Sequence, residues 1–138
     1  MTRHALREQV FRLLFRVDFF PEEDLKAQSA LYLEDEEQQD LTPSERLFVQ
    51  ERYETICSRL GEIDAEINEK TTGWVTTRMG KAELTILRLA VYEIRHDDNV
   101  PVAVAIDEAV ELAKAYGQDD SPSFVNGVLA RFVGDGNG

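Results

Sequence analysis

Residues 101–129 constrain the fold of this chain more than any other stretch. Apolar side chains recur there at the spacing of one helix face: Ile106, Ala109, Val110 and Ala113. Pro101 suits the first turn of a helix, and Gly117 suits the left-handed residue that often ends one. Ser121 before Pro122 predicts the N-cap of a second helix. The region therefore predicts two helices joined by a short acidic turn.

The same spacing predicts four further helices upstream. They cover residues 2–17, about 25–33, 42–70 and 81–96. Gly61 is the candidate for a break in the third of them. Thr42 and Glu45 favour a helix start because together they can form a capping box. No convincing strand pattern occurs, so the sequence predicts an all-α fold.

Periodicity also separates the expected core from the expected surface in the helix over residues 81–96. The core positions are predicted to be Leu84, Leu87, Val91 and Ile94. The positions expected to lie largely outside are Arg88, Glu93 and Arg95.

Length and composition indicate one soluble domain. The chain has 138 residues, which is enough for a real core but short for two ordinary domains. A lone Cys57 excludes an internal disulfide and suits a reducing compartment. No stretch approaches the roughly 18 apolar residues that span a bilayer, and Arg12 and Arg16 interrupt the only run that could serve as a signal peptide. We expect a cytoplasmic protein.

Charge is unevenly distributed along the chain. The formal net charge is −12, and such an acidic protein repels a polyanion at long range. Residues 1–20 nevertheless carry four arginines against Glu8 and Asp18. The acidic run at residues 34–37 is expected to be a solvated helix end or loop. The first helix is therefore the best candidate to meet a phosphate backbone.

That helix is predicted to carry two adjoining faces. The core face comprises Leu6, Val10, Leu13, Leu14 and Val17. The second face comprises Arg3, His4, Arg7, Phe11 and Phe15. Arginines beside exposed rings suit single-stranded nucleic acid, because bases stack on rings while guanidinium groups hold phosphates. The alternative, which composition alone favours, is that the two rings widen the core and the arginines are solvated.

Catalytic and metal-binding signatures are poorly supported. The sequence has no phosphate-binding loop, no Gly-x-Ser-x-Gly and no His-Glu-x-x-His motif. Cys57 lies in the middle of an amphipathic stretch, so we expect a buried thiol and not a nucleophile. Glu93 and His96 have the spacing of half a di-iron site, but no second copy is present. We expect no enzyme activity, no metal site and no cofactor.

Two blocks near the C-terminal end resemble a known family. Residues 105–114 read Ala-Ile-Asp-Glu-Ala-Val-Glu-Leu-Ala-Lys, and residues 124–129 read Phe-Val-Asn-Gly-Val-Leu. This combination closely resembles the NusB family of transcription antitermination factors. Asp107 is a mild departure, because the family is expected to have mostly Asn at this position.

Two upstream blocks agree with this resemblance. Trp74, Arg78 and residues 86–93 are similar to the family's middle helix. Residues 7–15 are similar to its first helix. The resemblance therefore spans almost the whole chain, and it is strongest from Leu84 to Leu129.

The resemblance implies both an architecture and a function. It implies a single domain of about seven helices over residues 1–133, with an N-terminal three-helix part packed on a C-terminal four-helix part. Residues 134–138 read as a flexible tail. It also implies a factor that binds the boxA element of nascent ribosomal RNA transcripts together with NusE, a small-subunit ribosomal protein. The pair is expected to join other Nus factors on RNA polymerase and to suppress premature termination.

The resemblance further implies which residues make these contacts. The RNA-binding residues would be Arg3, His4, Arg7, Tyr116, Asp120 and Phe124. For the rings of Tyr116 and Phe124 the alternative is that they pack in the core. The residues facing NusE would be Phe15 and Glu83. The family's arginine-rich motif is reduced here, so we expect weak RNA affinity for the isolated protein. Asn126 and Gly127 are expected to be structural, with the glycine permitting close approach of another helix.

Two other functions stay open. The chain could be an acidic helical adaptor that recruits basic proteins without touching RNA. It could also be an accessory domain for RNA methylation, because similar domains occur fused to methyltransferases. The sequence has no glycine-rich cofactor-binding unit, so we do not expect it to transfer a methyl group itself. The oligomeric state is not readable from the sequence.

Overall fold

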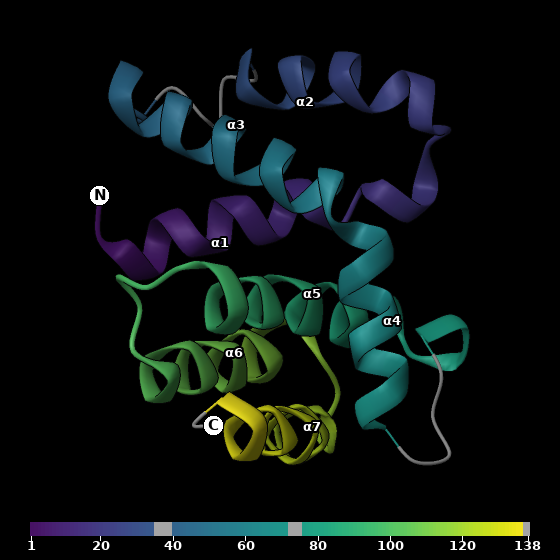
Figure 1. Cartoon of the computed structure of the whole chain (residues 1–138). Coiled ribbons are helices and arrows are strands. Elements are labelled where there is room, and N and C mark those ends of the chain that lie inside the picture. The colour runs from purple at the N-terminus through teal and green to yellow at the C-terminus, as the bar shows by residue number, and fades with distance from the viewer. Residues whose placement is uncertain (35–39, 72–75, 137–138) are drawn as a thin grey trace. The chain divides into compact units, whose positions relative to one another are not determined.

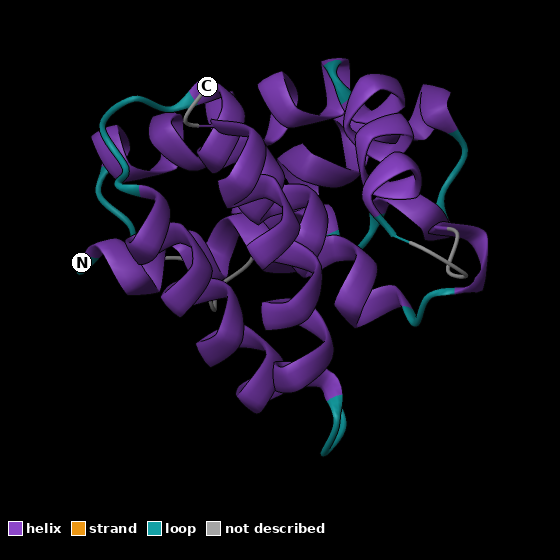
Figure 2. Ribbon diagram, turned by 60° about the horizontal axis from the view of Figure 1, so that its bottom comes forward, coloured by secondary structure: helices purple, strands orange, loops and turns teal. Residues whose placement is uncertain are grey.

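The described part of the chain is entirely helical. In this computed structural model it comprises residues 1–34, 40–71 and 76–136, and within these ranges there are seven α-helices and no strand (Figure 1, Figure 2). The all-α prediction with about seven helices is confirmed. No helix in these ranges is long and apolar enough to cross a membrane.

The helices fall into two compact units, which are described separately. Unit 1 covers Met1–Ser58 and unit 2 covers Arg59–Gly138. Unit 1 contains α1 (Arg3–Leu14), α2 (Leu25–Glu34) and α3 (Pro43–Ser58). Unit 2 contains α4 (Leu60–Lys70), α5 (Lys81–His96), α6 (Val102–Tyr116) and α7 (Ser121–Gly136). The expected division into three and four helices is therefore present.

Helix α1 begins with a side-chain cap and ends earlier than expected. The Thr2 hydroxyl accepts a hydrogen bond from the Ala5 amide at 3.0 Å, which satisfies one of the free donors of the first turn. The helix ends at Leu14, three residues before the predicted boundary, and Val17–Phe19 forms a separate 3-10 turn. Its core face is made mainly by Val10, Phe11, Leu13 and Leu14, which are all buried.

Unit 1 is joined by polar contacts as well as by apolar packing. Helix α1 packs against α3. The Tyr32 hydroxyl on α2 donates to Gln9 Oε1 on α1 at 2.6 Å. The Arg46 guanidinium on α3 donates to the Leu33 carbonyl near the end of α2. The last of these contacts satisfies one of the carbonyls that a helix end leaves unpaired.

The capping box predicted at the start of α3 is confirmed. The Glu45 amide donates to Thr42 Oγ1 at 3.1 Å, and the Thr42 amide donates to Glu45 Oε1 at 2.9 Å. This reciprocal pair satisfies two backbone donors. The hydrogen bond of Glu45 with the Met1 ammonium, followed by that with the Thr42 amide, lowers the pKa of its carboxyl.

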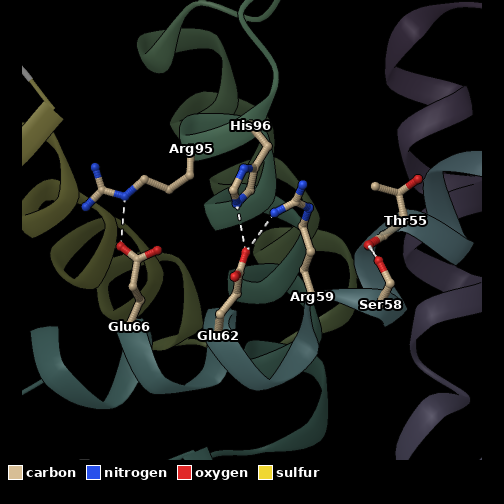
Figure 3. A network of polar contacts seen from close by, with 7 residues as sticks. All are labelled: Thr55, Ser58, Arg59, Glu62, Glu66, Arg95 and His96. Atoms are coloured by element: carbon tan, nitrogen blue, oxygen red, sulfur yellow. Dashed lines mark hydrogen bonds and ion pairs between the residues drawn. The ribbon is translucent and has the colours of Figure 1, made fainter.

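The long helix predicted over residues 42–70, with Gly61 as the candidate break, is divided at Arg59 and not at Gly61. The chain leaves helical geometry at Arg59 (φ −114°, ψ 9°), and Gly61 lies inside α4. Before the break, the Ser58 hydroxyl donates to the Thr55 carbonyl at 2.7 Å (Figure 3), and the Thr55 hydroxyl donates to the Glu51 carbonyl at 2.8 Å. Hydroxyls bonded in this way compete with backbone amides for carbonyls and favour a bend or an end.

Unit 2 is a bundle in which α5 has neighbours on several sides. Helix α5 packs against α4, α6 and α7, and α6 also packs against α7. The fully buried side chains include Ile63, Ile67, Leu87, Leu112, Leu129 and Phe132. Arg88 and Glu93 are buried as well, which contradicts the expectation that they lie outside, while Ile94 is only half-buried. Periodicity assumes one buried face, and this helix is covered on more than one.

The last helix extends beyond the predicted end of the domain at residue 133. Helix α7 continues to Gly136. A helix already in place adds one hydrogen bond for each further residue, which can offset the cost of a glycine in its final turn. Trp74, most of the acidic run after Glu34 and the last two residues lie outside the described residues.

Candidate nucleic-acid interface

The first candidate group lies at the start of α1 in unit 1. Arg3 and His4 are exposed, and Arg7 is half-buried one turn further along the helix. Two other arginines of this region have internal contacts. Arg12 lies 3.7 Å from the Glu8 carboxylate, and the Arg16 guanidinium lies 4.8 Å from the centre of the Tyr32 ring. Among the three predicted basic residues, Arg3 and His4 are thus the exposed ones.

The aromatic part of the predicted α1 face is only partly present. Phe11 has 2% of its surface exposed, so it belongs to the core and the alternative interpretation is correct for this ring. Phe15 is half-buried, with its ring centre 6.1 Å from that of Phe11 and 5.3 Å from that of Phe19. Phe19 is 56% exposed and was missed as a candidate. Its position just after the helix, beyond the reach of helical periodicity, explains the omission.

The second candidate group lies at the corner between α6 and α7 in unit 2. Tyr116 is the last residue of α6 and is half-buried. Asp120 is exposed, and Phe124 is half-buried in the first turn of α7. The Phe124 amide donates to the Asp120 carbonyl at 3.1 Å. The two aromatic residues thus lie at the ends of the helices that flank the short connection, and Asp120 lies on it.

Gly117 makes this corner possible, but not for the predicted reason. Its φ is −96°, which is not the left-handed conformation. A Cβ at this position would lie 2.6 Å from Ser121 Oγ and 2.8 Å from the Ala113 carbonyl oxygen. Both distances are shorter than real side chains tolerate. Glycine is therefore needed here for space, because the chain doubles back closely on itself.

Ser121 connects this corner to the start of α5. Its hydroxyl accepts a hydrogen bond at 2.8 Å from the Gln118 amide, three residues earlier in the chain. This is not the predicted N-cap contact, because an N-cap side chain accepts from an amide two or three residues further on and Ser121 is the first residue of α7. The same hydroxyl donates to the Glu83 carboxylate in the first turn of α5. Local sequence patterns do not indicate this second contact, because its partners are 38 residues apart.

The two residues expected to face a protein partner lie in different units. Phe15 follows the last residue of α1 in unit 1, and Glu83 lies on α5 in unit 2. Both are half-buried. The basic candidates likewise lie on α1 in unit 1, whereas the two aromatic candidates and Asp120 lie at the α6–α7 corner in unit 2.

A network of polar contacts lies at the start of α4 and between α4 and α5 (Figure 3). Glu62 Oε1 lies 3.0 Å from Arg59 Nη1 and 3.4 Å from His96 Nε2. Glu66 Oε2 lies 2.8 Å from Arg95 Nε. The contacts of His96 with Glu62 and of Arg95 with Glu66 join α5 to α4, whereas that of Arg59 with Glu62 is local to the start of α4. Throughout the described ranges, no group of three or more His, Cys, Asp or Glu side chains could hold a metal ion.

Cys57 is half-buried on α3, and not fully buried as expected. It interacts with the buried Tyr53, whose pKa is raised first by burial and then by this thiol. A tyrosine with a raised pKa stays protonated at neutral pH, so it offers the thiol no base. Nothing in this contact resembles an activated nucleophile.

Comparison with known proteins gives the family. The model of the NusB family matches residues 4–134. A transcription antitermination protein NusB from Agathobacter rectalis is 50% identical over 133 residues, which cover 96% of this chain and 100% of that protein. The structure of T. maritima NusB superimposes with a TM-score of 0.86 at 32% identity, covering 98% of this chain and 92% of that one.

One similar structure contains other molecules. A crystal structure of antitermination factors NusB and NusE in complex with dsRNA matches with a TM-score of 0.79 at 25% identity. The match covers 94% of this chain and 96% of that one. Sequence, length and fold all agree over nearly the whole molecule. This chain belongs to the NusB family.

Proposed function

We propose that this chain is a transcription antitermination factor that binds boxA RNA of nascent ribosomal RNA transcripts together with NusE. The observation that carries the proposal is the match over nearly the full length to proteins named as NusB antitermination factors. A structure of such a factor with NusE and dsRNA supports the two kinds of partner. In this proposal the chain acts as a scaffold and catalyses no reaction.

The proposed RNA contacts come from both candidate groups. Arg3, His4 and Arg7 supply charge-assisted hydrogen bonds to phosphates from the exposed start of α1. Tyr116 and Phe124 offer partly exposed ring surface on which unpaired bases can stack. Asp120 is exposed between them and can accept hydrogen bonds from base amino groups.

The net charge of −12 explains why a partner would be needed. Neutralisation of phosphates supplies most of the sequence-independent affinity for RNA, and few cations lie on this chain's proposed RNA surface. A basic partner such as NusE would add positive surface next to the RNA. Opposite charges on the two proteins would also accelerate their association. Phe15 and Glu83 are the proposed contacts with NusE, and the assembled pair would join other Nus factors on RNA polymerase.

The same charge favours one second function. An acidic helical adaptor could recruit basic proteins without touching RNA. Under that function, substitution of Arg3 and Arg7 would leave activity unchanged, because neither residue would contact a partner's phosphate. The two functions therefore make opposite predictions for the same variant.

The test is binding of a fluorescent boxA RNA across a salt series, with a scrambled RNA of equal length as reference. The chain alone is expected to bind weakly, and the chain with NusE much more tightly and in favour of boxA. The variant Arg3→Ala/Arg7→Ala should weaken binding in the NusE complex and reduce the salt slope by about 1.4, since each single-strand phosphate contact contributes about 0.7.

The matched control is Arg12→Ala/Arg52→Ala, which removes the same charge from unit 1. Arg12 is paired with Glu8, and the Arg52 guanidinium lies over the Phe48 ring at 5.1 Å. This control should bind boxA nearly as well as the unmodified chain. If both double variants weakened boxA binding equally, the loss would be explained by the change in net charge and not by contacts of Arg3 and Arg7. If boxA and scrambled RNA bound equally poorly with NusE present, the adaptor function would be favoured.

A further inference from the structure

A hydrogen bond joins Glu83 to Ser121 at the corner that carries three of the residues proposed to touch RNA, and neither of the two belongs to that set. Ser121 is 2% exposed, so it is inaccessible to an RNA or protein partner. Its hydroxyl is used twice, as acceptor for the Gln118 amide and as donor to Glu83. One buried oxygen thus links the α6–α7 connection to the first turn of α5.

Two glycines make room for this pair. A Cβ at Gly80 would collide with Glu83 Oε1, so glycine allows that carboxylate to fold back on the chain where α5 begins. A Cβ at Gly117 would collide with Ser121. The side chain of Glu83 thus occupies the space beside Gly80, and that of Ser121 the space beside Gly117. Their hydrogen bond joins the start of α5 to the α6–α7 connection.

The consequence for the corner follows from chain length. Tyr116 precedes the serine by five residues, Asp120 by one, and Phe124 follows it by three. With the Ser121 hydroxyl bonded on both sides, the start of α7 has a fixed direction relative to the end of α6. The relative placement of the two rings depends on that direction.

We infer that Glu83 and Ser121 are positioning residues, whose hydrogen bond sets the α6–α7 corner in the conformation that presents Tyr116, Asp120 and Phe124 to RNA. The inference rests on the proposed function and deepens it. Glu83 then acts on RNA binding through Ser121, in addition to any contact that it makes with NusE. Loss of the hydrogen bond leaves unit 2 folded but misplaces the rings.

The variants separate this role from a partner contact. Ser121→Ala removes both hydrogen bonds at a position that no partner can reach. Glu83→Ala removes the acceptor alone, and Glu83→Gln keeps an acceptor oxygen. The controls are Ser123→Ala, an exposed serine in the same turn, and Glu111→Ala, which removes one negative charge from an exposed position on α6.

The measurement is the affinity for boxA and for scrambled RNA at a NusE concentration that saturates each variant. It is made at a temperature at which circular dichroism shows each variant fully folded. A purely structural role would lower the melting temperature and leave the affinity of the folded protein unchanged. A positioning role lowers the affinity and the preference for boxA as well.

Ser121→Ala and Glu83→Ala are each expected to weaken boxA binding by about tenfold, the effect of losing one base–ring stack. Glu83→Gln should recover most of that loss. The double variant Glu83→Ala/Ser121→Ala should lose no more than Ser121→Ala alone, because both changes remove the same Glu83–Ser121 hydrogen bond. Neither control should weaken binding, and Glu111→Ala should bind slightly more tightly, because it removes a negative charge.

Unchanged boxA affinity in folded Ser121→Ala would overturn the inference. So would additive losses in the double variant, which would indicate that Glu83 acts separately, as a contact with NusE or RNA. Failure of the proposed function has a different signature: the unmodified chain with NusE would then show no preference for boxA over scrambled RNA. That result ends both proposals before any variant is compared.

Discussion

The Arg88 guanidinium on α5 donates two parallel hydrogen bonds to the Asp64 carboxylate on α4. The Nε–Oδ1 distance is 2.8 Å and the Nη2–Oδ2 distance is 2.7 Å. Such bidentate pairs are strong and directional. Arg88 is only 6% exposed, so its charge has little access to water and depends on this partner. The arginine consequently serves the fold of unit 2.

Asp64→Ala should destabilise the protein, because it leaves a buried guanidinium without its carboxylate. Breaking a buried pair typically costs about 3–5 kcal/mol, and we expect a value at or below the lower end because the Asp64 side chain is partly exposed. Urea unfolding followed by circular dichroism measures the change. The control is Glu62→Ala, whose side chain is more exposed and which should cost less than about 1 kcal/mol. Equal losses for the two variants would contradict the assignment.

The aromatic side chains near the end of α1 should also differ sharply in their effect on stability. Phe11→Ala should cost about 3–5 kcal/mol, because it empties a buried site. Phe19→Ala should change stability by about 0.5 kcal/mol or less, because that ring is mostly exposed. Thermal unfolding of both variants checks the difference. A small effect of Phe11→Ala would make this ring a candidate for base stacking again.

Much of the fold could be predicted from local signals. Helical spacing placed α5 and α6 within about one residue of their actual ends, and Thr42 with Glu45 marked the start of α3. Each of these features depends on residues less than two turns apart. Local sequence is sufficient for such features because the interactions that decide them are local.

The incorrect predictions of helix ends and of buried residues have a different cause. The break at Arg59 depends on hydroxyl groups that bond to carbonyls of their own helix, and spacing of apolar residues does not register them. The burial of Arg88 and Glu93 depends on how many helices surround α5. These are properties of the assembled bundle, so one helix considered alone cannot reveal them.

The candidate site came mainly from the family resemblance. Periodicity could place Arg3 and Arg7 on one edge of a helix, but it could not assign a ligand to them. It placed a helix start near Ser121 but missed the bond to Glu83, because that contact joins distant parts of the sequence. The roles of the site residues stay predictions that the proposed experiments test.

Two glycines should respond in opposite ways to alanine. Gly127 lies within α7, and a Cβ added there would have no other atom within 4 Å, which contradicts the expectation that this glycine permits close helix approach. Gly127→Ala should therefore stabilise the protein by about 0.5–1 kcal/mol, the gain in helix propensity. Gly117→Ala should destabilise it, because the new Cβ meets Ser121 and the Ala113 carbonyl. Melting temperatures that move in the same direction for both variants would contradict these assignments.

The capping box of α3 should give the protein a defined loss of stability in acid. The Met1 ammonium and then the Thr42 amide lower the pKa of the Glu45 carboxyl in the folded state. A lowered folded-state pKa means that the carboxylate stabilises the fold above its unfolded pKa, near 4.5. This contribution is lost as the pH falls through the lower folded value. Glu45→Gln should thus be less stable than the unmodified chain at pH 7, and the gap should close in acid.

Urea unfolding between pH 7 and pH 3 measures that gap. The control is Glu51→Gln, which removes the same charge from α3 without touching the cap. Its stability should run parallel to that of the unmodified chain over this range, apart from a small constant offset. If Glu45→Gln ran parallel as well, the carboxylate would contribute nothing through its charge, and the cap would depend on the Thr42 hydroxyl alone.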